Sequence, residues 1–178
     1  MKVFLILILA GLFAGCATTI PPQSVEELRD EVRSGPSMIR MAEYEIKRPF
    51  NQAYNAVQIN AERCFEVTVT MPSGKNVGPK VKFVRYRVDS LMTSETTAET
   101  YMQVDKVSKD PMPLGGYYVL LADIEAMSSD TTLLTIYGVL NGYDNVHASI
   151  VAWAQGKNDD CPRFPMGALD QTFTYHNP

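Results

Sequence analysis

The 178-residue sequence predicts the α+β class: an antiparallel, curved sheet of five to six strands with two helices packed on one face. Several segments alternate apolar and polar residues with a period of two, which is typical of half-buried strands. Two other segments show the spacing of an amphipathic helix. The strands follow one another in runs rather than alternating strictly with helices, and this order favours α+β.

The first half of the chain predicts a strand, a helix and three further strands. Residues 42–46 alternate apolar with charged side chains, and Pro49 ends this strand. Asn51 is expected to cap a helix that runs to about Cys64. One face of that helix is apolar and is expected to lie in the core: Phe50, Tyr54, Val57, Ala61 and Cys64. The strands that follow are predicted over residues 65–71, 84–88 and 96–107, the last with a weaker pattern.

The second half predicts a central hairpin and a last helix. Residues 117–127 are apolar on nearly both faces, as in a central strand, and a turn at 128–130 leads into a strand over 131–139. A helix is expected from about Asp144 to Gln155, with Gly156 just past its end. Residues 162–178 lack a strong pattern and receive no element.

The resulting order, β-α-β-β-β-β-β-α over roughly 38–161, resembles a helix-grip domain. Such domains occur in accessory lipoproteins of the outer-membrane barrel-assembly machinery and, more remotely, in steroid-transfer folds. This resemblance rests on element order alone, and no functional motif comes with it. The chain also resembles short proteobacterial envelope lipoproteins that have a cysteine closing each helix. That likeness implies a location rather than an activity.

The first residues have the layout of a secretory signal. Lys2 supplies the charged start, residues 3–13 the apolar core, and Ala14 and Gly15 the small residues before a cleavage site. The apolar core is about eleven residues long, whereas a transmembrane helix needs roughly 20. The segment Leu12-Phe13-Ala14-Gly15-Cys16 resembles a bacterial lipobox, although Phe13 stands where that family usually has Leu, Val or Ile. The other interpretation is an ordinary cleaved signal followed by a chance cysteine.

The lipobox resemblance implies three parts of the chain. Residues 1–15 would be the signal peptide, residues 16–37 the lipidated Cys16, a tether and a short helix, and residues 38–178 a single periplasmic α+β domain. Ser24 and Glu27 form a capping box at the start of that short helix. The helix is expected either to pack on the domain or to remain part of the tether. The partner of Cys16 would be the lipid bilayer, through its acyl chains, and Ala17 in place of Asp favours the periplasmic face of the outer membrane.

Charge and cysteine count restrict the partners. The chain has 16 basic and 20 acidic side chains, so loss of Lys2 with the signal would leave a net charge near −5. A mildly acidic surface argues against nucleic acid as a partner. Cys64 and Cys161 are expected to form a disulfide in an oxidising compartment. The alternative, a metal-binding or redox pair, is disfavoured because the two are far apart and no CxxC motif exists.

No catalytic, cofactor-binding or metal-binding motif stands out in the sequence. We expect His147 to be a solvated helix residue, His176 to lie in a poorly ordered chain end, and Asp159 and Asp160 to face water. Five strand tyrosines are expected to pack in the core rather than line a cavity: Tyr86, Tyr101, Tyr117, Tyr118 and Tyr137.

Two functions are therefore expected, neither of them enzymatic. The first is a membrane-anchored envelope lipoprotein whose domain is a structural or protein-interaction module with envelope protein partners. The alternative is a binding module for a small apolar ligand held between sheet and helices.

Overall fold

The structure is a computed structural model that describes residues 21–34, 39–71, 82–107, 112–139, 143–157, 160–163 and 172–176. These residues form three helices: α1 (Val25–Arg33), α2 (Phe50–Phe65) and α3 (Asp144–Ala154). They also form seven strands: β1 (Ile39–Ile46), β2 (Val67–Met71), β3 (Lys82–Met92), β4 (Thr97–Val107), β5 (Tyr117–Ala126), β6 (Thr132–Val139) and β7 (Thr172–Tyr175).

The seven strands form one open antiparallel sheet in the order β1-β6-β5-β4-β3-β2-β7. The predicted α+β class and antiparallel sheet are confirmed. The sheet has one strand more than the five to six predicted, because β7 lies in the tail where no element was expected. β7 has only four residues, too few to show a pattern, and it forms by pairing with β2 from Val67–Tyr175 to Thr70–Thr172.

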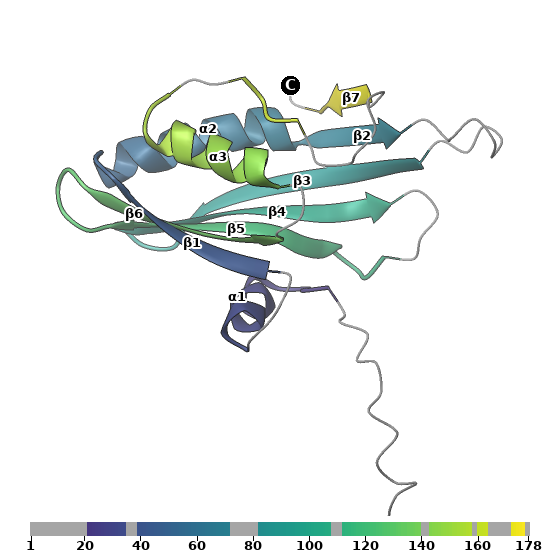
Figure 1. Ribbon diagram of the computed structural model, residues 1–178, viewed down its shortest axis with the longest axis horizontal. Helices are drawn as coiled ribbons and strands as arrows, with labels where there is room; N and C mark the ends of the chain where they lie inside the picture. The colour runs from purple at the N-terminus through teal and green to yellow at the C-terminus, as the bar shows by residue number, and fades with distance from the viewer. Residues whose placement is uncertain are drawn as a thin grey trace, which may run out of the picture.

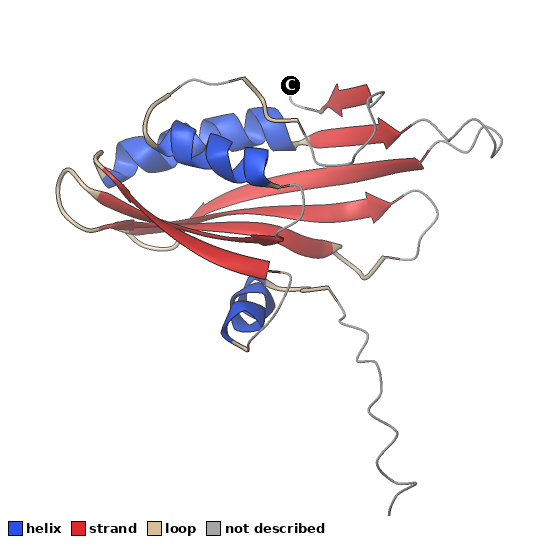
Figure 2. Ribbon diagram, viewed as in Figure 1, coloured by secondary structure: helices blue, strands red, loops and turns tan. Residues whose placement is uncertain are grey.

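Helices α2 and α3 cover the same face of the sheet, as predicted (Figures 1 and 2). Both are crossovers between the two sides of the sheet. Helix α2 leads from the edge strand β1 to β2 near the other edge, and α3 leads from β6 to the opposite edge strand β7. We call the face under α2 and α3 the helix-covered face, and the opposite face the outer face.

The sheet is twisted, and two register shifts contribute to its shape (Figure 1). One lies between Arg85 and Tyr86 in the β3–β4 pairing, and the other between Met102 and Gln103 in the β4–β5 pairing. Each shift leaves an extra residue on one strand, and such bulges bend the strand and increase its local twist. The predicted curvature of the sheet thus has a local structural cause.

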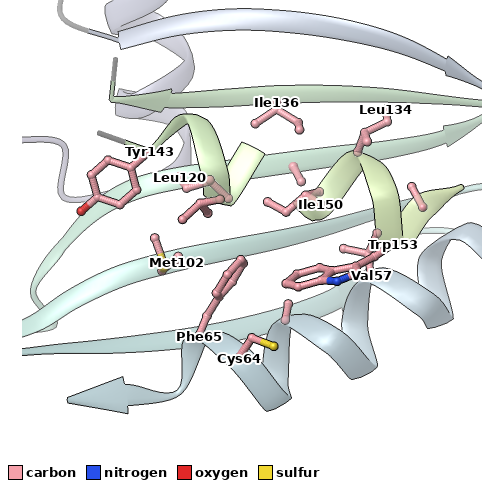
Figure 3. Close-up of a cluster of buried hydrophobic side chains, with 14 of the residues drawn as sticks. Val57, Cys64, Phe65, Met102, Leu120, Leu134, Ile136, Tyr143, Ile150 and Trp153 are labelled. Atoms are coloured by element: carbon pink, nitrogen blue, oxygen red, sulfur yellow. The ribbon is translucent and has the colours of Figure 1, made fainter. Parts of the chain in front are cut away.

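The main core lies between the helix-covered face and the two helices (Figure 3). Trp153 of α3 packs against Phe65 of α2 with ring centroids 5.2 Å apart, and both side chains are buried. The apolar stripe predicted on α2 is entirely buried. The expected cap was wrong, because α2 begins at Phe50 and the side chain of Asn51 accepts a hydrogen bond from Gln52 N within the first turn.

Helix α1 packs on the outer face, which answers the question that the sequence left open (Figure 1). Its capping serine behaves as predicted: Ser24 Oγ accepts from Glu27 N at 3.1 Å. The Glu27 carboxylate accepts from Gln23 N rather than from Ser24 N. Packed structure therefore begins near Pro22, before the boundary at residue 38 that was expected between tether and domain.

Candidate functional site

The candidate site is the place on the outer face of the sheet where the N-terminal segment joins the folded domain. Cys16, the predicted lipidation site, lies outside the described residues, so its lipidation stays a prediction. The described chain begins on the outer face of the sheet, where Tyr118 N of β5 donates a 2.8 Å hydrogen bond to the Pro22 carbonyl. Any segment that precedes Pro22 consequently leaves the domain from a fixed point beside β5.

Helix α1 is held by a small apolar cluster that is separate from the main core. Leu28 is completely buried and packs with Ile39 of β1 and Leu121 of β5. Around this centre lie partly buried apolar and aromatic side chains from the helix and the sheet: Val25, Val32, Tyr101, Tyr118 and Tyr137. Val25, Leu28 and Val32, spaced three and four residues apart, therefore form the face by which α1 binds the sheet.

Next to Leu28, an ionic cluster fixes the helix to two strands. Arg29 donates to both carboxylate oxygens of Asp123 in β5, at 2.7 and 3.2 Å, and to Glu99 Oε1 in β4 at 2.6 Å. We call these three residues the Arg29 cluster. Their side chains are 19 to 28% exposed, so the ion pairs are partly protected from water. Such charge-assisted, two-pronged contacts are stronger and more directional than exposed surface pairs.

The ionisation of the Arg29 cluster reflects this packing. Burial works against the charge on Arg29, but its hydrogen bonds to Asp123 and Glu99 outweigh burial and raise its pKa. Burial also raises the pKa of Asp123, and the nearby carboxylates Glu99 and Glu125 add to that rise against the influence of Arg29. Asp123 thus depends on Arg29 for its partner, and removing Arg29 would leave a poorly solvated carboxylate.

The predicted disulfide between Cys64 and Cys161 is confirmed, with sulfurs 2.04 Å apart. Cys64 is completely buried near the end of α2, beside Phe65, and Cys161 follows α3. The bond therefore joins the end of α2 to the segment that follows α3. Its position in packed structure indicates a structural rather than a redox role.

His147 is not the solvated residue that the sequence predicted. Its Nε2 is buried and has no hydrogen-bond partner among the described residues. It lies over Gly138 of β6 so closely that a Cβ built on Gly138 would sit 2.4 Å from Nε2. Burial lowers the pKa of His147, while Asp144 opposes that shift. The glycine explains how an imidazole fits between helix and sheet.

The remaining predicted polar candidates lie at the surface. His176 directly follows β7; its N donates to the Glu66 carbonyl at 2.8 Å, and its Nε2 lies 2.6 Å from Thr68 Oγ1. The described chain end is thus tied to β2, against the expectation of poor order. Asp160 is exposed as expected, and Asp159 lies outside the described residues.

The five strand tyrosines divide between the two faces of the sheet. Tyr86 is buried on the helix-covered side, where its hydroxyl lies 3.1 Å from that of Tyr143, and Tyr117 packs against the same core. Tyr101, Tyr118 and Tyr137 belong instead to the cluster under α1. Tyr101 also donates to Asp89, and burial together with that carboxylate raises its pKa to about 12. The expectation of packing rather than cavity lining fits both groups.

Within the described part of the chain, two surface hollows are lined mainly by polar and charged side chains. One, of about 200 Å³, borders the Arg29 cluster together with Thr93, Thr97 and Glu125. The other, of about 290 Å³, is lined by Glu66, Arg85, Arg87 and His176. Its charges are largely engaged already, since Arg85 forms a two-pronged pair with Asp105 and Glu66 accepts from Val88 N.

Among the residues that the structure describes, no group of three His, Cys, Asp or Glu side chains is placed to hold a metal ion. Over the same residues, each helix falls short of the length and apolar character that crossing a bilayer requires.

Neither a protein-family model nor a curated protein matches the chain. Among solved structures, the X-ray structure of norcoclaurine synthase from Thalictrum flavum is similar over 66% of this chain and 84% of that chain. The sequence identity is 12% and the TM-score is 0.33. A likeness this distant assigns neither activity nor ligand to the chain, and the fold described above rests on its own strand order and helix placement.

Proposed function

We propose that this protein is an envelope lipoprotein, held to the periplasmic face of the outer membrane by acyl chains on Cys16. Its folded domain acts as a non-catalytic structural or protein-interaction module. The observation that carries the proposal is the Cys64–Cys161 disulfide, with Cys64 completely buried and Cys161 partly buried against the main core. It supports export of the domain, and export is what the signal-like residues 1–15 require.

The disulfide bears on location because cytosolic thiols are kept reduced, whereas disulfides form and persist in the periplasm. Here the bond links α2 of the main core to the segment after α3, with a sequence separation of 97 residues. A domain that relies on such a bond is best suited to an oxidising compartment. Together with the Leu12–Cys16 segment, this supports a lipoprotein more than a cytosolic protein with a chance apolar start.

Anchoring through Cys16 is also sufficient energetically. Each buried CH₂ of an acyl chain contributes about 0.8 kcal/mol, and two or three chains hold a protein durably. The described surface near the anchor offers no basic substitute, because α1 begins with Glu26 and Glu27 and its Arg29 is paired. The acyl chains would therefore provide the attachment by themselves.

Exposed apolar side chains at one end of the sheet support the interaction module. Leu91 and Met92 end β3, and Met127 follows β5 at the same end, where Ala126 N donates to Thr96 O at 2.9 Å. All three side chains are exposed. Leu91 and Met92 are consecutive strand residues, so they point to opposite faces and place apolar side chains on both sides of this end of the sheet. We propose this end of the sheet, with Leu91, Met92 and Met127, as the contact for an envelope protein partner.

The alternative, a small apolar ligand between sheet and helices, would need side chains to move. Met102, Leu120, Ile136 and Ile150 are completely buried in that layer and fill the space under the helices (Figure 3). A ligand that enters there should raise the melting temperature of the protein, since it would bind only the folded state. Absence of any such rise across a panel of lipids leaves the interaction module as the better proposal.

Metabolic labelling with palmitate tests the anchor. The wild-type protein should incorporate label and partition with membranes, and Cys16→Ser should do neither. Ala17→Ser is the matched control, because it introduces the same side chain next to the thiol without removing it. Equal labelling of the wild type and Cys16→Ser, or no label in either, contradicts the lipoprotein.

Affinity purification from detergent-solubilised membranes tests the module. A partner should be recovered with the wild type and lost when Leu91, Met92 and Met127 are changed to Ser. The matched control is Leu114→Ser, which removes a fully exposed leucine near the opposite end of the sheet. Recovery of the lipoprotein alone, or equal recovery of a partner with both variants, contradicts the proposed contact at this end of the sheet.

A further inference from the structure

We infer that docking of α1 sets the orientation of the domain on the membrane, with the outer face of the sheet toward the bilayer and the α2–α3 face away from it. This inference rests on the proposed anchor at Cys16. It assigns a role to α1 and predicts that the α2–α3 face remains open to partners. The orientation follows from the short length of chain between Cys16 and Pro22, the first residue held by the domain.

Contacts before and within the helix fix α1 to the outer face. Before the helix, the Pro22 carbonyl accepts from Tyr118 N. Within the helix, Leu28 is buried against Ile39 and Leu121, and Arg29 is paired with Asp123 and Glu99. These contacts come from three strands, β1, β4 and β5, so the helix cannot pivot about a single point without breaking some of them.

Docking shortens the free chain between bilayer and domain. Six peptide steps separate Cys16 from Pro22, and they span at most about 20 Å when fully extended. If α1 were undocked, the free segment would run to Ile39, where β1 begins, and its fully extended reach would be roughly 75 Å. The docked helix therefore keeps the domain close to the membrane surface.

The same short reach disfavours the inverted orientation. With the α2–α3 face on the bilayer, a helix layer about 10 to 12 Å thick and the sheet itself would separate the lipid from the outer face. The segment from Cys16 to Pro22 would then have to be almost fully extended to cover that distance. With the outer face toward the bilayer, the distance from Pro22 to the lipid is well within this reach.

The ion pairs of the Arg29 cluster give a way to undock α1 without disturbing the main core. Arg29→Ala removes both pairs and leaves Asp123 partly buried without its partner. Arg33→Ala is the matched control on the same helix, because Arg33 is exposed and pairs only with the equally exposed Asp30 in the described structure. Asp123→Asn is a second variant that weakens the cluster from the side of the sheet.

Hydrogen exchange of the full-length protein tests docking without reference to lipid. Amides of α1 should exchange roughly tenfold faster in Arg29→Ala than in the wild type, because local opening of the helix becomes easier. Amides of α2, on the other face of the sheet, should be unchanged, and Arg33→Ala should match the wild type. Equal protection of α1 in all variants, including Asp123→Asn, would show that the Arg29 cluster does not hold the helix.

Energy transfer in vesicles tests orientation. The protein is purified from membranes, reconstituted into vesicles of phosphatidylethanolamine and phosphatidylglycerol, and labelled through an unnatural residue at Met41 or Ile59. Met41 is 47% exposed and lies on the same face of β1 as Ile39, whereas Ile59 is 64% exposed on α2. Transfer to a headgroup dye should be greater from Met41 in the wild type, and this difference should shrink in Arg29→Ala.

The outcomes separate this inference from the proposed function. A protein that does not partition into the vesicles overturns the anchor and, with it, the orientation. A vesicle-bound protein with equal transfer from both sites, or greater transfer from Ile59, overturns the orientation alone. A difference that persists in Arg29→Ala, although exchange shows α1 to be undocked, assigns orientation to another surface and overturns the role of the helix.

Discussion

Removing the Cys64–Cys161 disulfide should cost the domain a large part of its stability. The bond closes a loop of 97 residues. In the chain-entropy model, a cross-link across a loop of that length destabilises the unfolded state by about 4 to 5 kcal/mol. Small domains have a total free energy of unfolding of roughly 5 to 15 kcal/mol, so the loss would bring this domain close to instability.

Urea denaturation followed by circular dichroism measures the effect. We compare the oxidised wild type, the wild type with reductant, and the double variant Cys64→Ala/Cys161→Ala. With a slope of about 2 kcal/mol per molar urea, the midpoint should fall by roughly 2 M in both perturbed samples. Agreement between the reduced and double-variant samples assigns the loss to the cross-link rather than to packing of the buried Cys64 side chain. A loss below about 1 kcal/mol in both samples would refute the reasoning.

Three further predictions concern individual side chains. Gly138→Ala should destabilise the domain by about 1 to 3 kcal/mol, because the new Cβ would clash with His147, and Gly138→Ala in a His147→Ala background should cost clearly less in the same denaturation assay. Because burial lowers the pKa of His147 in the fold, the unfolded chain binds more protons at acidic pH. Stability should therefore fall as the pH drops below about 6.5, and the fall should be smaller in His147→Ala; parallel slopes contradict this. Because the pKa of Tyr101 is raised to about 12, only the unfolded phenol ionises between pH 10 and that value, so stability should decrease as the pH rises through this range. Ultraviolet titration of the folded protein should lose a tyrosinate component near pH 12 in Tyr101→Phe, and no difference from the wild type would exclude the assigned shift.

The elements with strong periodicity could be predicted from the sequence, and the weak ones could not. The α2 stripe and the alternation in β1 and β2 are local patterns, and each forms the expected element. Strand β7 has four residues and forms by pairing with β2, so no pattern within its own sequence could predict it. The start of α2 was misplaced because Asn51 is a good capping residue, yet the helix already begins at Phe50.

Two parts of the candidate site could be predicted from the sequence. The Ser24–Glu27 cap joins residues three apart, and the Cys64–Cys161 disulfide follows because these are the two cysteines that remain after Cys16. The Arg29 cluster was not predicted, because its partners lie 70 and 94 residues away and their proximity depends on the strand order. The same holds for His147, whose burial depends on a glycine in the adjacent strand.

The sheet order also determines when the fold can be completed. Both edges are made by pairing distant parts of the chain: β1 with β6, where Ile39 meets Val139, and β2 with β7, where Val67 meets Tyr175. The inner hairpins from β2 to β6 need only local loop closure, which is fast, whereas long-range pairings are slow. A chain delivered from its N-terminus would hold β1 unpaired until β6 has emerged, and β7 would close the sheet last.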